Sequence, residues 1–440
     1  MSTLIFLLAI MLLLMWIAFK TSEITVSPQV GLIAGFILQI LFCLFYVNTW
    51  NISLHFKTIF TVVTGSALFL AVSMLCEALE KAELKKGQDV THYANENYIE
   101  VESYKLVLFA IIQIIALAGY ISFLNTNMYG AGLAAKIYNY RSRTADFGEA
   151  IIVPRALSFL RLISSAAGYT LSLIFVFNYM NKNLRHRLLF AINIILSVLL
   201  EGILGARGGI MNFVISIFTE ILIVRYISLN KTVTLKTLAK VLIAAAGIII
   251  GLPIIGMLMG RPDLGPWYEI AVYIGAPLKN LDTFLRNPVN YSSHHVSTFY
   301  RLLSDFSGFF EPIINIELQR FPSTWQFING KTLGNVYTTY ATFWYDLSGW
   351  GIPFYTILMA LIFRVLYRNM MAVRVVGSTK GILSIVMYVY FYSTIVFAFF
   401  GNRFYSQFFS FYTLKFVIAT VTVSFFITQM RFSINGKVLR

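Results

Sequence analysis

Arginines at the ends of apolar segments are the residues of this chain best suited to chemistry. A planar guanidinium group donates two parallel hydrogen bonds to one phosphate and does not lose its proton. Such arginines are Arg141, Arg143, Arg207, Arg261 and Arg403. Small residues surround three of them, in segments 205–209, 260–263 and 401–404. The pattern predicts a site for a phosphate or pyrophosphate group, onto which Arg207, Arg261 and Arg403 converge.

Each arginine also has a purely structural interpretation. At Arg207 the alternative is a side chain that extends to the membrane surface from a tight turn. At Arg261 it is an ion pair with Asp263 at the end of a helix. For Arg141 and Arg143 it is a solvated loop. The residue types and their spacing leave these alternatives open.

Acid-base chemistry has several candidates in the same loops. A general base has to lie within hydrogen-bonding reach of the proton that it accepts. The first candidates are Asp282 and Asp263. The adjacent pair His294 and His295 could also supply a base, although adjacent histidines in a serine-rich loop are more often solvated. Position alone does not separate these from the remaining carboxylates of the same loops, which are Glu269, Asp305, Glu311, Glu317 and Asp346.

Motifs for cofactors and metals are absent from the sequence. It contains no Walker loop, no Gly-x-Gly-x-x-Gly after a strand, no His-Glu-x-x-His and no Gly-x-Ser-x-Gly. No Asp-x-Asp pair occurs either. We therefore expect neither a bound cofactor nor a metal site.

Composition shows which elements have to position these residues. The chain has 440 residues, of which 58% are hydrophobic and 12% are charged, whereas soluble domains have about 45–50% and about 25%. A helix of about 20 apolar residues crosses the hydrocarbon core of a bilayer. About eleven runs approach that length, namely 3–19, 29–47, 58–76, 105–124, 157–180, 187–204, 209–227, 237–259, 349–367, 381–400 and 411–430. The expected fold is an all-α integral membrane protein, with residues 1–440 in a single polytopic domain.

Basic residues set the expected topology. The net charge of +15 reflects lysines and arginines in cytoplasmic loops that face membrane lipid, and nucleic acid is not an expected partner. The chain then starts outside, and residues 260–348 form a large outer loop whose many aromatic residues indicate order. Within the spans, the ionisable residues Arg161, Glu201 and Glu220 are either buried structural partners or parts of a polar cavity.

Four segments of the predicted outer face occur in a characteristic order: residues 205–209, 272–282, 335–338 and 346–351. Together they resemble the Wzy-type O-antigen and capsular oligosaccharide repeat-unit polymerases of bacterial membranes. The last two are similar to that family's Asn-x-Tyr and Asp-Phe-Gly-x-x-Gly segments. Leu347 stands in place of Phe and Ser348 in place of Gly, which weakens any role assigned to the backbone of that turn.

The resemblance implies a glycosyltransferase C-like fold in the bacterial inner membrane, with the active site facing the periplasm. It implies a glycosyltransferase that joins repeat units carried on undecaprenyl pyrophosphate into the O-antigen of lipopolysaccharide or into capsule. The growing glycan would leave its lipid carrier for the non-reducing end of a newly flipped unit. Donor and acceptor are both lipid-linked oligosaccharides, and a chain-length regulator is a candidate protein partner.

The resemblance also divides the outer residues into roles. Arg207, Arg261 and Arg403 would bind pyrophosphate, assisted by Arg141 and Arg143, and stabilise its developing charge. Asp282, Asp263, His294 or His295 would deprotonate the acceptor hydroxyl. Trp267, Tyr273 and Tyr337 would stack on sugar rings, and their alternative role is the hydrophobic core of the outer loop.

Two other functions remain open at this stage. A flippase or transporter of lipid-linked oligosaccharide also needs many spans and cationic contacts to the headgroup. Transporters, however, place their site near the midplane on broken helices, whereas this sequence gathers arginines at one outer surface. A glycan-to-lipid ligase differs mainly in its acceptor, and the sequence separates it poorly from a polymerase.

Overall fold

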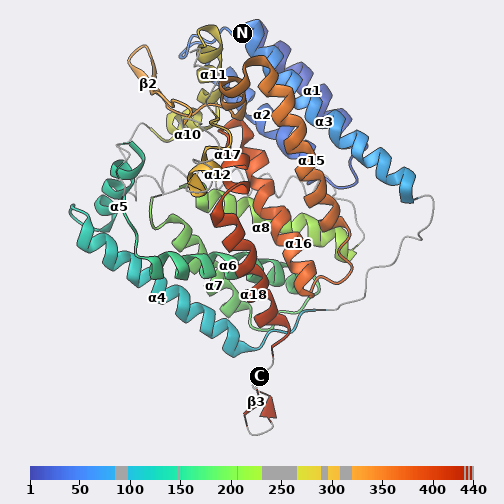
Figure 1. Ribbon diagram of the computed structural model, residues 1–440, viewed down its shortest axis with the longest axis vertical. Coiled ribbons are helices and arrows are strands. Elements are labelled where there is room, and N and C mark those ends of the chain that lie inside the picture. The colour runs from blue at the N-terminus through green and yellow to red at the C-terminus, as the bar shows by residue number, and fades with distance from the viewer. Residues whose placement is uncertain are drawn as a thin grey trace. The chain divides into compact units, whose positions relative to one another are not determined.

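The computed structural model describes residues 1–84, 98–146, 149, 151–205, 207–229, 265–288, 296–307, 320–430, 433–434 and 437–438. Its longer helices (Figure 1) are α1 (Ser2–Thr21), α2 (Pro28–Phe45), α3 (Phe56–Leu84), α4 (Ser103–Asn127), α6 (Arg155–Met180), α7 (Arg187–Gly202), α8 (Arg207–Leu229), α15 (Gly351–Met371), α16 (Thr379–Val396) and α18 (Phe411–Thr428). The shorter helical segments are α5 (Leu133–Arg141), η1 (Ser142–Asp146), α10 (Pro266–Ile274), α11 (Ala276–Arg286), α12 (Tyr300–Asp305), α14 (Thr339–Leu347), η2 (Ser348–Trp350), η3 (Phe397–Phe399) and α17 (Arg403–Phe408).

Two short antiparallel hairpins are the β-structure of the described residues. In the first, β1 (Gln326–Ile328) pairs with β2 (Lys331–Gly334). In the second, β3 (Ser433–Ile434) pairs with β4 (Lys437–Val438). The turn of the first hairpin places Asn329 and Gly330 at φ of +51° and +72°, which suits an Asn-Gly pair because these two residues tolerate positive φ best.

Nine helical stretches of the described residues are long and apolar enough to cross a membrane: Ser2–Thr21, Pro28–Phe45, Phe56–Glu80, Ser103–Asn127, Arg155–Met180, Arg207–Ile227, Thr339–Met371, Thr379–Phe399 and Phe411–Thr428. The chain is therefore an all-α, multi-pass membrane protein, as its composition predicts. The expected span 187–204 is helix α7, whose 16 residues are fewer than in the other spans. The expected span 237–259 lies outside the described residues.

One span differs from its sequence prediction in extent. Hydropathy predicts a span over residues 349–367, whereas the helical stretch runs from Thr339 to Met371 and includes α14, η2 and α15. The break between α14 and α15 falls at Ser348, which has φ of +50° and ψ of −141°. A helix cannot continue through that conformation.

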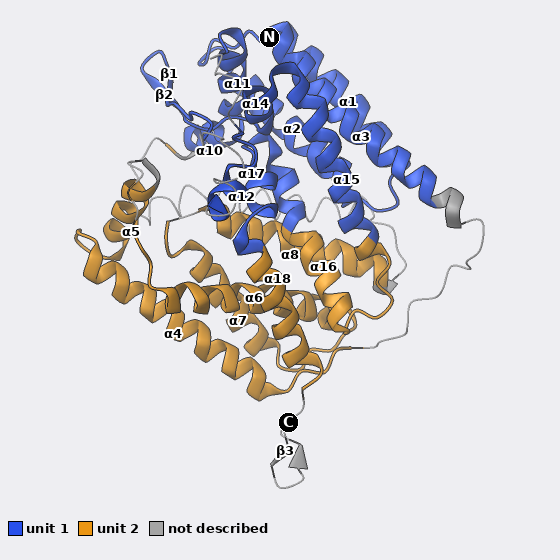
Figure 2. Cartoon of the chain, in the orientation of Figure 1, with its two compact units in different colours: residues 1–91, 267–368, 391–413 blue, residues 92–266, 369–390, 414–440 orange. Residues whose placement is uncertain are grey.

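The described helices form two compact units (Figure 2). Unit 1 comprises residues 1–91, 267–368 and 391–413, and unit 2 comprises residues 92–266, 369–390 and 414–440. Each unit thus combines segments that are distant in the sequence.

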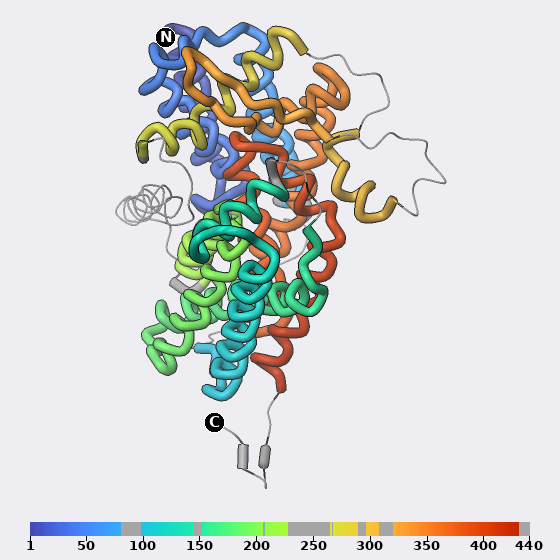
Figure 3. Tube along the Cα trace, turned by 90° about the vertical axis from the view of Figure 1, so that its left-hand side faces the viewer, coloured from blue at the N-terminus to red at the C-terminus, as the bar shows by residue number. Residues whose placement is uncertain are grey.

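In unit 1, helices α1, α2 and α3 lie side by side (Figure 1, Figure 3), and α11 packs against α2, α3 and α14. Small residues allow close contacts: a Cβ atom on Gly35 of α2 would lie 2.3 Å from the carbonyl oxygen of Val396. The buried Gln39 Nε2 donates to the carbonyl of Phe399 over 2.9 Å. Such polar bonds between segments are favourable in a membrane, where no water competes for them.

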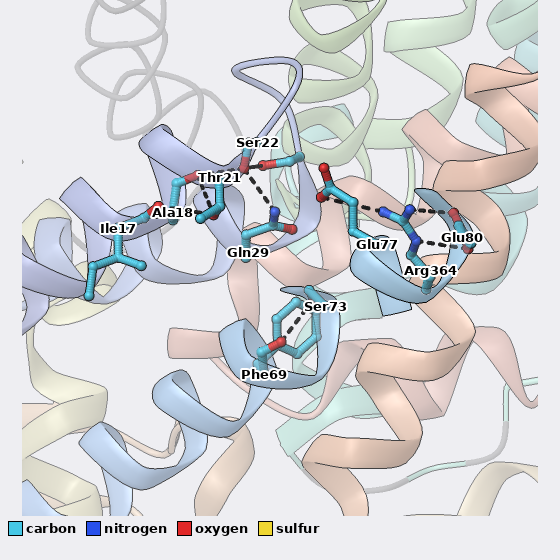
Figure 4. A network of polar contacts seen from close by, with 11 residues as sticks. Ile17, Ala18, Thr21, Ser22, Gln29, Phe69, Ser73, Glu77, Glu80 and Arg364 are labelled. Atoms are coloured by element: carbon cyan, nitrogen blue, oxygen red, sulfur yellow. Dashed lines mark hydrogen bonds and ion pairs between the residues drawn. The ribbon is translucent and has the colours of Figure 1, made fainter. Parts of the chain in front are cut away.

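A polar network joins α3 to α15, at the end of unit 1 that the expected topology would place in the cytoplasm (Figure 4). The Arg364 guanidinium makes a bidentate contact with Glu80, in which Nε donates to Oε1 over 3.1 Å, and its Nη1 lies 3.8 Å from Glu77 Oε2. Nearby, Gln29 Nε2 donates to Ser22 Oγ over 2.8 Å. The arginine, which is mostly buried, thus has two carboxylate partners to offset its desolvation.

In unit 2, helices α4, α6, α7 and α8 pack against one another. A Cβ atom on Gly168 of α6 would lie only 2.4 Å from Ser197 Oγ of α7, so glycine permits this close approach. Gln113 of α4 donates to the same hydroxyl over 2.9 Å. At the C-terminal end of α18, the buried Lys105 ammonium donates to the carbonyls of Ile427 and Met430, where a cation also favours the helix dipole.

Much of the expected outer loop, residues 260–348, has regular structure where it is described. It contains α10, α11, α12, the β1–β2 hairpin and α14. Carboxylates hydrogen-bond the backbone of this loop. Asp346 accepts the backbone N–H groups of Ser297 and Thr298 over 2.8 and 2.7 Å. Asp305 Oδ2 accepts the N–H of Phe411 over 2.9 Å.

Candidate functional site

The short connection between α7 and α8 places Arg207 at the N-terminal end of α8. Gly205 has φ of +73°, which glycine adopts without the strain that a side chain would bring. A Cβ atom on Gly205 would also lie 3.2 Å from Arg141 Cβ and from Ile137 Cγ2. The end of α5 therefore lies directly against this turn. Arg207 is the first residue of α8, and only 6% of its surface is exposed.

Glu201, near the end of α7, pairs with an arginine of a neighbouring helix. Its Oε2 pairs with Arg161 Nη2 of α6 at 3.4 Å, and its Oε1 accepts the hydroxyl of Ser165 over 2.8 Å. A Cβ atom on Gly209 would lie 2.8 Å from Oε2, so the carboxylate also lies against the first turn of α8. The helix dipole stabilises a negative charge at that position.

Aromatic and apolar residues surround Arg161. Arg161 hydrogen-bonds Tyr120 of α4. Burial raises the pKa of Tyr140 of α5, and the Arg161 charge opposes that shift. Both tyrosines belong to a buried cluster with Leu200 and Ile203. The guanidinium therefore has a low-dielectric surrounding, in which its attraction for an anion is stronger than in water.

We call this group the arginine cluster: Arg141, Arg161, Arg207 and Glu201. It comprises three cations and one anion from α5, α6, α8 and α7. Such an excess of positive charge suits an anionic group such as phosphate. The sequence pattern predicts this role for Arg141 and Arg207 but not for Arg161, whose signal is its position as an arginine within a span.

Arg143, the remaining arginine predicted for this loop, has a partner in its own segment. Its Nε donates to Glu149 Oε2 over 2.7 Å, and Nη2 lies 2.6 Å from the same oxygen. This hydrogen bond raises the pKa of Arg143. The assisting role of Arg143 stays a prediction, and it would require exchange of that carboxylate for substrate.

In unit 1, two residues predicted for binding lie on one aromatic ring. Phe400 stacks on Tyr273 of α10, with ring centroids 5.6 Å apart and planes inclined by 14°. The guanidinium carbon of Arg403, the first residue of α17, lies 5.0 Å from the centroid of the Phe400 ring. Arg403 and Tyr273, which are distant in sequence, thus share a neighbour that sequence analysis did not single out. Phe400 gave no signal among the many aromatic residues of the chain.

The other two aromatic candidates differ from each other. Trp267 is 63% exposed, and its sugar-stacking role stays a prediction. Tyr337 is only 7% exposed. Its hydroxyl accepts a bond from Gln326 Nε2 over 2.9 Å and donates to the carbonyl of Thr324 over 3.1 Å. Tyr337 is thus buried within the described part of the loop, and its sugar-stacking role stays a prediction.

Asp282 of α11, the first candidate base, is completely buried. Its Oδ1 accepts the backbone N–H of His55 over 2.7 Å and the hydroxyl of Thr58 over 2.8 Å. Its Oδ2 accepts Arg286 Nε over 3.0 Å. These contacts give the carboxylate a structural role. The other base candidates, Asp263, His294 and His295, lie outside the described residues, as does Arg261.

Arg207 belongs to unit 2 and Arg403 to unit 1, so their convergence stays a prediction. Within the parts of the chain that the structure describes, no group of three or more His, Cys, Asp and Glu residues could hold a metal ion.

Comparison with known proteins finds no similarity: no protein-family model, no curated protein and no solved structure matches this chain.

Proposed function

We propose that this protein is a glycosyltransferase that polymerises oligosaccharide repeat units carried on undecaprenyl pyrophosphate, for O-antigen or capsule. The observation that carries the proposal is the arginine cluster. It surrounds the segment 205–209, which is one of the four segments that resemble Wzy-type polymerases. Three cationic side chains at the predicted outer end of a membrane helix bundle suit a lipid pyrophosphate.

The proposed reaction needs such a cluster because its leaving group is anionic. As the bond between the anomeric carbon and the phosphate oxygen breaks, negative charge grows on the pyrophosphate. Guanidinium groups that are already in place stabilise that charge without reorganising. Arg207 and Arg161 act on the pyrophosphate in this proposal, and Glu201 holds Arg161 in position. Arg141, which is exposed, contacts the outer phosphate.

The proposal also fits the multi-pass architecture. A lipid carrier stays in the bilayer while its headgroup reaches the membrane surface, so the enzyme has to bind both. We propose a glycosyltransferase C-like arrangement in the bacterial inner membrane, with the site facing the periplasm. The lipid-linked donor and acceptor are the substrates, and a chain-length regulator is a candidate partner.

The decisive experiment uses purified protein in nanodiscs with a synthetic lipid-pyrophosphate repeat unit, excess chelator and no nucleotide sugar. A ladder of products is the expected result. We expect Arg207→Lys and Arg161→Lys to lower the rate by about two orders of magnitude each, as loss of one preorganised donor does. Lysine keeps the charge but loses the two parallel hydrogen bonds.

Arg185→Lys is the matched control, because Arg185 forms an exposed pair with Glu100 at 3.5 Å in a loop of the predicted cytoplasmic face. It should leave the rate unchanged. Full activity of Arg207→Lys and Arg161→Lys at normal protein levels would contradict bidentate recognition of pyrophosphate. No ladder from well-folded wild-type protein would contradict polymerisation and favour transport or ligation to another acceptor.

A further inference from the structure

Glu220 is an ionisable residue within a predicted span, and the proposed function does not use it. It belongs to α8 and to the candidate span Arg207–Ile227. It follows Arg207 by thirteen residues, which is about 20 Å along a helix axis. Its side chain is completely buried. Ionisable residues are costly inside a membrane, so such a position indicates either a structural partner or a functional site.

The hydrogen-bond partner of Glu220, among the described residues, is Ser172 of α6. The Ser172 Oγ lies 3.0 Å from Glu220 Oε1 and also 3.0 Å from the carbonyl oxygen of Tyr169. The other carboxyl oxygen, Oε2, is buried and has no hydrogen-bond partner in the described structure. All three residues belong to unit 2, so these contacts lie within one compact unit.

The number of protons at these contacts indicates the state of the carboxyl group. A serine hydroxyl has one proton to donate and two lone pairs to accept. Within a helix, serine commonly donates to a carbonyl three or four residues before it, which here is that of Tyr169. Ser172 then has to accept at its contact with Glu220, and a carboxyl group donates only when it is protonated. A proton on Oε1 therefore satisfies both 3.0 Å contacts at once.

The helices around Glu220 provide no cation that would stabilise its ionised form. Helices α6, α7 and α16 contact α8. With α8 itself they carry these ionisable residues in unit 2: Arg155, Arg161, Tyr169, Tyr179, Arg187, Glu201, Arg207, Arg225, Tyr226, Lys380, Tyr388 and Tyr390. Among the described residues, none of their side chains forms an ion pair or hydrogen bond with Glu220. An anion buried in this way is strongly disfavoured, whereas the neutral acid avoids that cost.

A metal cation fits the same position less well than a proton. Hard cations take about six or more oxygen ligands in proteins, whereas one hydroxyl and one carboxyl group meet here. The ligand that suits these two groups is a proton.

Polar residues continue along the side of α8 that carries Glu220. Asn212 and Ser216 precede it by eight and four residues, a spacing that places side chains on one side of a helix. Both are buried, and Asn212 Oδ1 has no hydrogen-bond partner in the described structure. Ser216 Oγ lies 3.0 Å from the carbonyl oxygen of Val389 of α16. This polar side leads from Glu220 toward the N-terminal end of α8.

We propose that Glu220 is a proton-binding site within the membrane, and that the folded protein holds it as a neutral carboxylic acid. On binding, a hydronium ion transfers its proton to Oε1 and becomes water. The reverse step returns the proton to water and leaves a buried anion. The proton exchanges along the side of α8 that carries Ser216 and Asn212. The site is separate from the proposed glycosyl transfer, and no step of that reaction uses it.

Infrared difference spectroscopy of the full-length protein in nanodiscs tests the state of Glu220. A protonated carboxyl group has a carbonyl band that a carboxylate lacks. The spectrum of wild type minus that of Glu220→Gln, at neutral pH, should contain this band. Glu149→Gln is the matched control, because Glu149 pairs with Arg143 at 2.6 Å on an exposed loop. Its difference spectrum should contain carboxylate bands only.

Transfer to deuterated water tests exchange, because the carbonyl band shifts when deuterium replaces the proton. We expect the whole band to shift in wild type and to shift more slowly in Asn212→Leu. Thr219→Val is the matched control, since the Thr219 hydroxyl donates to the carbonyl of Ile215 in its own helix over 2.8 Å. It should exchange at the wild-type rate. Equal rates in the two variants would contradict exchange along the side of α8 that carries Asn212.

Labelling with N,N′-dicyclohexylcarbodiimide, an apolar reagent that couples to protonated carboxyl groups, is a second measurement that needs no variant. Peptide mapping by mass spectrometry should find Glu220 labelled at neutral pH, and the label should decrease as rising pH removes the proton. Glu201, which pairs with Arg161, is the internal control. It should be labelled at least about tenfold more slowly, since the rate follows the protonated fraction.

Four results would overturn the assignment. The first is a Glu220→Gln difference spectrum with carboxylate bands in place of the protonated band. The second is labelling of Glu220 no faster than that of Glu201. The third is protection of Glu220 from the reagent by sodium ions at constant pH, which would assign the position to a metal cation. The fourth is a band that never shifts in deuterated water, which would make the proton a fixed structural one. If Glu220→Gln does not fold, the labelling of wild type decides.

Discussion

Replacing Asp282 by alanine should destabilise unit 1, and the structure gives the size of the effect. The two hydrogen bonds from His55 and Thr58 end on a buried, charged acceptor, and each such bond contributes about 1.5 kcal/mol. The ion pair with Arg286 is half exposed and adds at most about 0.5 kcal/mol after solvent screening. The total is about 3 kcal/mol, or roughly a hundredfold in the unfolding equilibrium.

The assay is equilibrium unfolding in mixed detergent and SDS micelles, followed by tryptophan fluorescence. Asp282→Asn should lose less than Asp282→Ala, because its amide oxygen can keep the two bonds to His55 and Thr58. Glu149→Gln is the control, since Glu149 pairs with Arg143 on an exposed loop and should change stability by less than about 0.5 kcal/mol. An Asp282→Ala variant with wild-type stability and no activity would refute the structural role and restore Asp282 as the catalytic base.

Four further substitutions test the packing by the same unfolding measurement. Gly35→Ala would place a Cβ atom 2.3 Å from the backbone oxygen of Val396 and should cost about 2 kcal/mol, whereas Gly349→Ala, whose nearest neighbour would lie at 3.7 Å, should be nearly neutral. Lys105→Met would remove a buried ammonium from two carbonyls at the end of α18 and should cost about 2 kcal/mol; unchanged stability would exclude this cap. Ser348→Gly should stabilise by about 1 kcal/mol, because Ser348 has φ of +50°, and a loss would show that the serine makes a compensating contact.

Hydropathy predicted the spans well because it reports a local property, the transfer of one segment into lipid. All nine candidate spans of the described residues correspond to predicted runs. The errors concern the ends. Helix α14, which begins at Thr339, and the break at Ser348 both precede the predicted apolar run 349–367. Polar and aromatic residues also form a helix when tertiary contacts support it.

The candidate site was predictable only in part. The small residues around Arg207 indicated a tight turn, and the turn brings Arg141 close through Gly205. The Arg161 and Glu201 pair joins residues 40 positions apart on different helices. Sequence analysis could identify both as costly charges within spans, but no periodicity relates one helix to another.

The aspartates of the outer loop show why a list of acidic residues does not by itself identify a base. Asp282, Asp305 and Asp346 each accept a backbone N–H group from a segment distant in sequence. Where the chain leaves a membrane helix, its backbone N–H groups no longer have partners within that helix. Near the hydrocarbon region, each of these N–H groups needs a hydrogen-bond acceptor. A carboxylate at such a position therefore serves as a structural hydrogen-bond acceptor, and this role competes with a role as a catalytic base.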